Sequence, residues 1–209
     1  MTIDEIMETA PVIPVLVLDG SHQPAELAST LVAAGLPVIE VTLRTPGALA
    51  AIEAMAAIPG TVVGAGTVLN PSQLNEALSA GARFIVSPGL TKPLAKAAIA
   101  ARIPYLPGVA NAGDIMRGLD LGLDLGLDRF KFFPAEAAGG MPALKALSAP
   151  FAGLRFCPTG GISAATAPDW LALEPVICVG GSWVVPRGAT LAQVGDLARR
   201  AAALSGPTN

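Results

Sequence analysis

The chain has 209 residues, of which 52% are hydrophobic and 14% are charged, and its net charge at pH 7 is −3. This length fits one domain and is enough to bury a large core. The acidic balance argues against nucleic acid as a partner, because neutralising phosphates requires clustered Lys and Arg. A chain with so few charges either has much interior or covers surface with copies of itself, so we expect a homo-oligomer.

The N-terminal residues MTIDEIMETA are polar and acidic, without the basic and apolar regions of a signal peptide. We expect them to form a short N-terminal helix. The longest uncharged stretch, residues 54–75, is interrupted repeatedly by Pro and Gly, which argues against a membrane-spanning helix. Cys157 and Cys178 lie in apolar segments and are too few for a disulfide framework. These features predict a soluble, cytoplasmic protein with no membrane partner.

Short apolar runs alternate along the chain with longer, alanine-rich segments that have the period of a helix. The predicted strands are residues 12–18, 37–43, 61–66, 83–89, 104–108, 129–134, 155–161 and 176–181. The predicted helices lie near residues 24–34, 46–57, 71–80, 91–101, 111–121, 140–147, 163–172 and 190–204. Several of them begin with a proline near the first helical position, as Pro24 and Pro71 do.

Strict alternation of strand and helix requires a parallel sheet. Eight such units predict an α/β fold of the closed (β/α)8 type, a TIM barrel, formed by a single domain over residues 1–209. The alternative is a doubly wound open sheet, which would normally carry a glycine fingerprint after its first strand. The sequence LVLDGSHQP after that strand has no such fingerprint. The barrel is therefore the favoured fold.

The second predicted strand, PVIEVTLRT, carries polar side chains on one face. Alternation places Val38, Glu40, Thr42 and Arg44 together, with the apolar residues opposite. The interior face of a barrel opens at the carboxyl ends of its strands, where barrel enzymes have their active sites. We therefore predict an active site that uses Glu40. The alternative is a Glu40–Arg44 ion pair that only fills the barrel, although a buried ion pair is weak evidence for stability.

The sixth predicted strand, within DRFKFFPAE, places Lys131 among three phenylalanines, although the chain has only four lysines. If Phe130 and Phe132 pack against helices, Lys131 points into the barrel with Phe133 above it. Desolvation there favours the neutral amine, which is a nucleophile for a carbonyl carbon. The alternative is the opposite parity, with Lys131 lying between helices and the phenylalanines less well buried. An imine-forming lysine also needs an acid–base group, and Glu40 is the obvious carboxylate.

Two glycine-rich turns, CPTGGIS and VGGSW, follow the seventh and eighth predicted strands. Glycine allows backbone N–H groups to approach an anion closely, and in TIM barrels these two loops often form a phosphate site. We therefore predict that Gly160, Gly161, Gly181 and Ser182 bind phosphate.

The segment GLDLGLDLGLD, residues 118–128, would place Asp120, Asp124 and Asp128 on one face if it were helical. A metal site there is disfavoured, because glycine weakens the helix and like charges repel, so we expect a helix end and a loop. His22 is the only histidine, and no Cys or His cluster has the spacing of metal ligands. A Ser-His-Asp triad and a catalytic zinc are therefore both improbable, which leaves imine chemistry without a metal or other cofactor.

The motifs VIEVTLRT, VGAGTVLN, SPG, RFKFFPAEAAGG, RFCPTGGIS and VGGSWVVP together resemble the class I 2-keto-3-deoxy-6-phosphogluconate (KDPG) aldolases over nearly the whole chain. The resemblance implies a (β/α)8 barrel assembled as a homotrimer that uses no metal. It also implies cleavage of KDPG, a phosphorylated 2-keto acid of the Entner–Doudoroff pathway, to pyruvate and glyceraldehyde 3-phosphate. Members of the family often also act on 4-hydroxy-2-oxoglutarate (KHG), which gives pyruvate and glyoxylate.

Carried over residue by residue, the resemblance implies Lys131 as the Schiff-base lysine and Glu40 as the general acid–base. It places Arg44 and Thr67 at the carboxylate of the pyruvate moiety. It also places Pro88 and Thr159 in the lining of the site, and it assigns phosphate binding to Gly160, Gly161 and Ser182. The strand parity adds Phe133 to the lining.

The chain departs from the family pattern in two places. One extra LGLD unit precedes the sixth strand, which puts the geometry of that loop in question more than the chemistry. Asn111 stands where family members more often carry Thr or Ser, a change that exchanges one helix cap for another.

Two other functions are compatible with these features. One is a phosphate-binding barrel isomerase or decarboxylase in which Lys131 acts only electrostatically, so that pyruvate forms no covalent adduct. The other is a non-enzymatic barrel used as an assembly subunit, which would tolerate the loss of Glu40 and Lys131. A barrel hosts many chemistries, so the site decides between them.

Overall fold

The computed structural model describes residues 1–122 and 127–204. Its strands are β1 (Val12–Leu16), β2 (Val38–Thr42), β3 (Val62–Gly66), β4 (Ile85–Val86), β5 (Tyr105–Leu106), β6 (Gly108–Val109), β7 (Arg129–Phe132), β8 (Arg155–Phe156) and β9 (Val179–Gly181). Its helices are α1 (Ile3–Glu8), α2 (Pro24–Ala33), α3 (Ala48–Ala56), α4 (Pro71–Ser79), α5 (Lys92–Ala100), α6 (Ala112–Gly122), α7 (Gly140–Ser148), α8 (Ala167–Leu171) and α9 (Leu191–Ala202), with a 3-10 turn η1 (Ser182–Val184).

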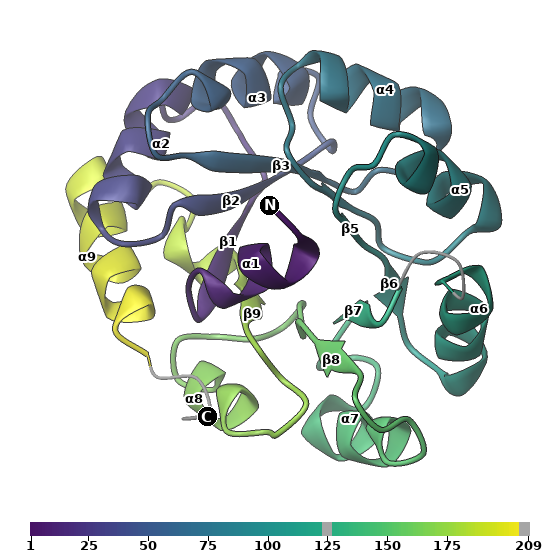
Figure 1. Ribbon diagram of the computed structural model, residues 1–209. Helices are drawn as coiled ribbons and strands as arrows, with labels where there is room; N and C mark the ends of the chain where they lie inside the picture. Colours follow the sequence, from purple (N-terminus) through teal and green to yellow (C-terminus); the bar gives the residue numbers. More distant parts are fainter. Residues whose placement is uncertain (123–126, 205–209) are drawn as a thin grey trace.

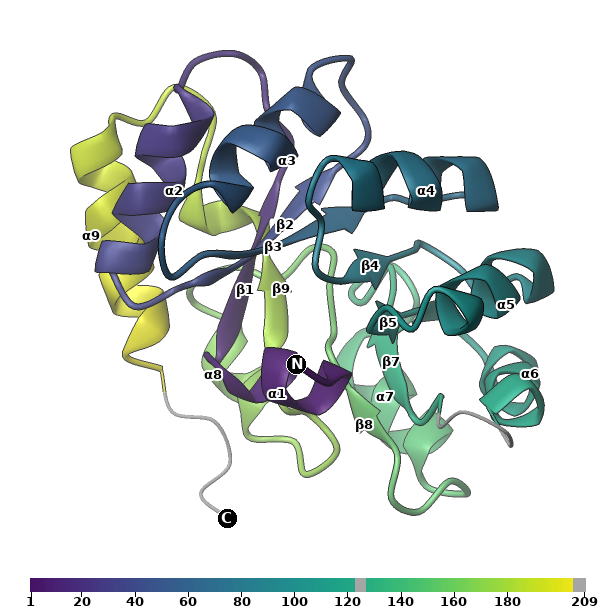
Figure 2. The same ribbon diagram turned by 45° about the horizontal axis from the view of Figure 1, so that its top comes forward.

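The strands form a curled parallel sheet with helices on its outer side. Six strands pair in the order β5-β4-β3-β2-β1-β9, and three more pair in the order β6-β7-β8. Helices α2 to α9 lie around the strands in chain order (Figure 1), and the tilted view shows them all outside the sheet (Figure 2). The predicted α/β fold with alternating strands and helices is confirmed.

The predicted fifth strand, residues 104–108, is divided into β5 and β6 by Pro107. Proline has no N–H, so it cannot donate a ladder hydrogen bond, and the pairing changes partner at this residue. β5 pairs with β4, whereas β6 pairs with β7. On the other side, single parallel bridges join Phe156 to Val176 and Thr159 to Gly180, which connects the β8 segment to the β9 segment.

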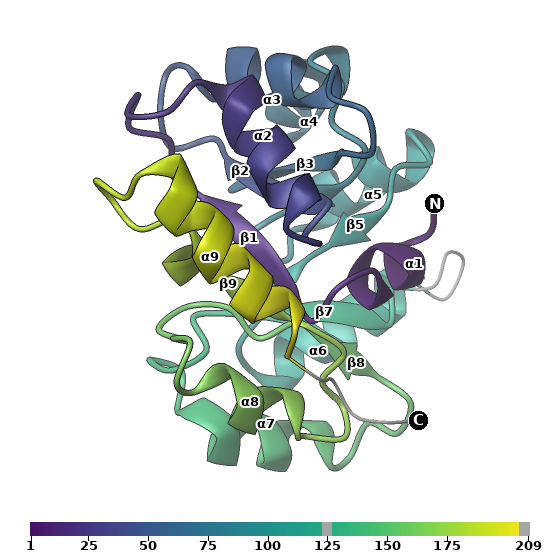
Figure 3. The ribbon, with the colours of Figure 1, turned by 90° about the vertical axis from the view of Figure 1, so that its left-hand side faces the viewer.

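Helix α1, which confirms the predicted N-terminal helix, covers the amino-terminal ends of the strands (Figure 3). Ile6 and Met7 are buried and pack into an apolar cluster inside the curled sheet. Asp4 forms an ion pair with Arg129 at the start of β7, which ties the helix to the sheet. The other members of the inner cluster are Ile13, Val38, Phe84, Val86, Leu106, Cys157 and Cys178. The amino-terminal end of the interior is therefore filled.

The described residues lack two kinds of feature. Within residues 1–122 and 127–204, no helix is long and apolar enough to cross a membrane. The same ranges contain no group of three or more His, Cys, Asp or Glu side chains that could hold a metal ion.

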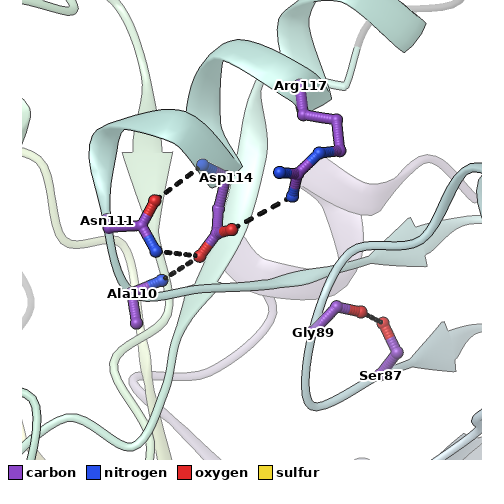
Figure 4. Close-up of polar contacts among 6 residues, drawn as sticks. All are labelled: Ser87, Gly89, Ala110, Asn111, Asp114 and Arg117. Carbon is purple, nitrogen blue, oxygen red and sulfur yellow. Dashed lines mark hydrogen bonds and ion pairs between the residues drawn. The ribbon is translucent and has the colours of Figure 1, made fainter.

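A buried hydroxyl pair fixes the turn that follows β4. The Tyr105 hydroxyl lies 2.6 Å from Ser87 Oγ, and Ser87 Oγ donates to the carbonyl of Gly89 at 2.7 Å (Figure 4). Because Ser87 has one proton and gives it to Gly89, the Tyr105 hydroxyl is the donor in the other hydrogen bond. Burial raises the pKa of Tyr105 to about 12.

This raised pKa predicts a loss of stability at alkaline pH. The folded protein keeps the phenol proton after the unfolded chain has lost it near pH 10. The stabilisation is therefore complete below about pH 10 and is lost, at up to about 1.4 kcal/mol per pH unit, as the pH rises toward 12. Tyr105 is the only tyrosine, so tyrosinate absorbance of the folded protein should titrate with a midpoint near 12. Tyr105→Phe should abolish that signal and flatten the pH dependence of urea unfolding. A folded midpoint near 10 would contradict the prediction.

Candidate active site

The two predicted catalytic side chains meet inside the curled sheet. Lys131 Nζ on β7 lies 3.0 Å from Glu40 Oε1 and 3.3 Å from Glu40 Oε2 on β2. Both residues are buried, with exposed fractions of 5% for Lys131 and 3% for Glu40. The inward orientation predicted for each is therefore confirmed. The partner of Glu40 is Lys131, so the alternative of a Glu40–Arg44 plug is wrong.

The phenylalanines of β7 determine which way Lys131 points. Phe130 and Phe132 are fully buried in the outer core between strands and helices. The Phe130 ring lies 6.1 Å from that of Phe156, and the Phe132 ring lies 6.3 Å from that of Trp170. Because side chains alternate along a strand, this outward packing directs Lys131 inward. Its Nζ lies 5.3 Å from the centre of the Phe133 ring, as predicted.

A glycine on the neighbouring strand makes room for the Glu40 carboxylate. β2 pairs with β3 in a register that sets Thr42 beside Gly66. A Cβ atom on Gly66 would lie 2.2 Å from Glu40 Oε1, closer than any real contact allows. The adjacent carboxylate thus explains why Gly66, the second glycine of GAG, cannot carry a side chain. Sequence reasoning missed this contact, because two glycines near a strand end usually signal a turn.

The Lys131–Glu40 contact provides a local route for a proton. The pair can exist as ammonium and carboxylate or as amine and carboxylic acid, and the two forms differ by one proton moved across 3.0 Å. Burial in a dry interior disfavours separated charges, so neither side chain is stable there as a lone ion. An amine generated in this way is a nucleophile, and the acid beside it can return the proton to a reacting oxygen.

Two cavities open at the carboxyl ends of the strands. One, of about 330 Å³, is lined by residues that include Pro88, Phe133 and Gly108, which is paired in register with Lys131. The other, of about 600 Å³, is lined by residues that include Ser182 and Val15, which is paired in register with Glu40. Neither Lys131 nor Glu40 lines either cavity, but each cavity contains a residue that pairs in register with one of them.

Arg44 and Thr67 occupy the ends of β2 and β3. β2 ends at Thr42, where the hydroxyl donates to the carbonyl of Leu16 at 2.8 Å, and the chain then turns. Arg44 is therefore exposed in that turn and is not part of the strand face on which the sequence placed it. Thr67 follows β3 with φ +57°, a strained conformation for a β-branched residue. Such strain often marks a functional turn.

The structure brings the two predicted phosphate loops together. Thr159 is buried and bridges to Gly180, so the loop after β8 lies beside the loop after β9. Gly160 and Gly161 have φ values of +105° and +82°, in the region that favours glycine. Gly181 differs, because its backbone is extended and the Trp183 ring fills the space that a side chain would need. Ser182 is exposed at the start of η1.

The start of α6 confirms the predicted cap. Asn111 Oδ1 accepts from the Asp114 N–H at 3.0 Å, so Asn111 caps the helix as expected (Figure 4). The Asp114 carboxylate accepts from the backbone N–H of Ala110 at 3.1 Å and from Asn111 Nδ2 at 2.9 Å. The Asp114 carboxylate therefore satisfies these two donors at the start of the helix. Of the three repeated aspartates, Asp124 lies outside the described residues.

The buried pair predicts how variants affect stability. Lys131→Met should lower the free energy of unfolding by up to about 3–5 kcal/mol, because it leaves Glu40 buried without a partner. The double variant Lys131→Met with Glu40→Gln should recover much of that loss, because no charge is then left unpaired. Urea unfolding at pH 8 measures both. Equal stability of the single and double variants would contradict this prediction.

Comparisons with known proteins bear on the family of this chain. The sequence model of the KDPG and KHG aldolase family matches residues 3–201. The 2-dehydro-3-deoxy-phosphogluconate aldolase of Zymomonas mobilis is 56% identical over 202 residues, which cover 96% of this chain and 95% of the relative. A crystal structure of the KDPG aldolase of Zymomonas mobilis with 3-phosphoglycerate superposes with a TM-score of 0.93 at 55% identity, covering 98% of this chain and 97% of that one.

A third comparison bears on the chemistry. The KDPG aldolase of Legionella pneumophila, solved with pyruvate captured as a covalent carbinolamine intermediate, is 42% identical. It superposes with a TM-score of 0.91, and the match covers 97% of this chain and 98% of that one. A carbinolamine is the adduct that an amine forms with a carbonyl group, and the buried lysine and carboxylate found here suit that step. The chain therefore belongs to the KDPG and KHG aldolase family, and it is a carbon–carbon lyase.

Proposed function

We propose that the chain cleaves KDPG to pyruvate and glyceraldehyde 3-phosphate through a Schiff base on Lys131, with Glu40 as the general acid–base. The observation that carries this proposal is the buried contact of 3.0 Å between the two side chains. Family membership and the carbinolamine captured in the Legionella aldolase support the same chemistry. KHG, which shares the 2-keto acid and 4-hydroxyl groups of KDPG, is a second substrate.

The first half of the reaction forms the imine. The neutral Lys131 amine attacks the C2 carbonyl carbon, and a proton passes from the attacking nitrogen to the carbonyl oxygen to give the carbinolamine. Glu40 as the carboxylic acid donates a proton to the departing hydroxyl, and water leaves. The resulting iminium carries a positive charge on nitrogen beside the Glu40 carboxylate, which stabilises it.

The second half breaks and remakes bonds to C3. A base, for which Glu40 acting through water is the best candidate, removes the proton of the C4 hydroxyl. The C3–C4 bond then breaks, and C4 with its oxygen becomes the aldehyde group. The electron pair of the broken bond moves through C3 and C2 to the iminium nitrogen. The enamine then takes a proton at C3, and water hydrolyses the imine to pyruvate and the free lysine.

Binding of the rest of the substrate involves three groups of residues. Arg44 and Thr67, at the ends of β2 and β3, bind the carboxylate next to C2. Pro88, Phe133 and Thr159 line the chain of the substrate, and the phosphate binds at Gly160, Gly161, Gly181 and Ser182. The bridge between Thr159 and Gly180 and the positive φ angles of Gly160 and Gly161 support the last group. The structure of the Zymomonas aldolase with 3-phosphoglycerate supports a phosphorylated ligand in this family.

We further infer that the strands form one closed (β/α)8 barrel in a single domain, with β5 and β6 as two halves of its fifth strand. The bridges from the β8 segment to the β9 segment support closure, and so does the packing of α2 against α9. A homotrimer in the cytoplasm remains a prediction. The exposed apolar side chains of Leu69 and Met116 are compatible with contacts between copies.

Covalent trapping tests the imine. Incubation with pyruvate and borohydride, followed by peptide mass mapping, should place one reduced pyruvyl adduct on Lys131. The other three lysines, Lys92, Lys96 and Lys145, are exposed and serve as internal controls. An adduct on one of them alone, or no adduct, would contradict the class I mechanism and favour an isomerase or decarboxylase.

A second variant separates proton transfer from nucleophilic attack. Glu40→Gln keeps the size of the side chain but cannot shuttle a proton, so kcat for KDPG cleavage should fall by about 10²–10⁴-fold. KM should change much less, because Lys131 and the binding loops are intact. Glu53→Gln, at an exposed site on α3, is the matched control. A kcat within threefold of the wild type would show that another group transfers the proton.

A further inference from the structure

Glu136, five residues after Lys131, lies against the loop that carries the proposed phosphate site. Its backbone N–H donates to the carbonyl of Gly160 at 3.0 Å, and the preceding N–H, of Ala135, donates to the carbonyl of Thr159 at 2.8 Å. These two hydrogen bonds continue the pairing of β7 with β8 beyond the ends of both strands. The loop after β7 is thereby joined to the loop after β8.

The side chain of Glu136 extends this contact to Gly161. A Cβ atom on Gly161 would lie 2.6 Å from Glu136 Cγ and 2.7 Å from Glu136 Cβ. The stem of the glutamate therefore occupies the space above Gly161 that a side chain would fill. Because Gly161 also has φ +82°, any other residue would be strained there. The Glu136 stem therefore packs directly against this turn.

Trp170 holds the other end of the Glu136 side chain. Trp170 is fully buried in α8, and its Nε1–H donates to Glu136 Oε1 at 2.9 Å. A buried indole N–H needs an acceptor, and this carboxylate supplies it. The Trp170 ring also packs near Phe132, which directly follows Lys131. One chain of contacts thus runs from the lysine strand through Trp170 and Glu136 to the glycine turn.

We propose that Glu136 and Trp170 are positioning residues for the phosphate of the substrate: they hold the Gly160–Gly161 turn in the shape that binds it. This inference rests on the proposed function. A carboxylate repels a phosphate, so Glu136 is not a ligand. It acts as a hydrogen-bond acceptor for Trp170 and as a packing surface for Gly161. The acceptor oxygen, and not the negative charge, is therefore the property that matters.

Three variants distinguish this role from a general structural one. Glu136→Ala removes the acceptor and the stem. Glu136→Gln keeps the stem and an oxygen that accepts from Trp170, but removes the charge. Glu53→Ala, at an exposed glutamate on α3, is the matched control. Glu136 is itself exposed, so these variants should fold, and urea unfolding checks that they do.

The readout is selectivity for phosphorylated ligands. Binding of 3-phosphoglycerate, measured by calorimetry against glycerate, should weaken about tenfold in Glu136→Ala, the effect of one lost hydrogen bond. The ratio of kcat/KM for KDPG to that for KHG should fall by a similar factor, mainly through KM for KDPG. Glu136→Gln should bind 3-phosphoglycerate at least as tightly as the wild type, because the acceptor remains and a repulsive charge is gone.

The outcomes separate this inference from the proposed function. Unchanged binding of 3-phosphoglycerate in Glu136→Ala, equal losses in the Ala and Gln variants, or equal losses for KDPG and KHG would each overturn the positioning role. A wild type that does not bind 3-phosphoglycerate would overturn it as well. If the wild type fails to turn over KDPG but the binding differences hold, the proposed function fails and the positioning role stands.

Discussion

The contact between Lys131 and Glu40 is the constraint on which the rest of the structure depends. Each side chain alone would be a buried ion without a partner, which a protein interior does not tolerate at low cost. The two residues are 91 positions apart and come from strands in different parts of the sheet order, so they meet only because the sheet curls. The fold that brings them together also excludes most water from them. The stability of the fold and the reactivity of the site thus both depend on the Lys131–Glu40 pair.

The two ends of the strands have different roles. At the amino-terminal end, Ile6 and Met7 of α1 fill the interior, and the Asp4–Arg129 ion pair fastens this helix to the same strand that carries Lys131. At the carboxyl end, the loops leave two cavities open. In α/β barrels, the amino-terminal ends of the parallel strands usually serve stability, and the carboxyl-terminal ends carry the active site. The filled end and the open end found here match this pattern.

Glycine is used here to bring functional groups close together. Gly66 leaves space for the Glu40 carboxylate, and Gly161 leaves space for the Glu136 stem. At Gly66 the backbone of β3 does not have a positive φ angle, so only the contact with Glu40 requires glycine. At Gly161, both the contact and the positive φ require it. The glycines of these two motifs are therefore required for different physical reasons, and only the surrounding side chains and the backbone φ angles distinguish them.

Local periodicity was enough to predict the alternation of strands and helices and the inward direction of Glu40 and Lys131, and the comparison with the family pattern predicted the cap at Asn111. These features depend on residues within a few positions of one another. The sequence placed Arg44 on the same strand face as Glu40, but β2 ends at Thr42 and leaves Arg44 exposed, because strand ends depend on partners that periodicity does not encode. The division of the fifth strand at Pro107 has the same origin. Only the tertiary structure determined the 3.0 Å contact of Lys131 with Glu40 and the hydrogen bond of Glu136 with Trp170, 34 residues away. Such contacts join segments that are distant in the sequence, so packing fixes them and no local pattern records them.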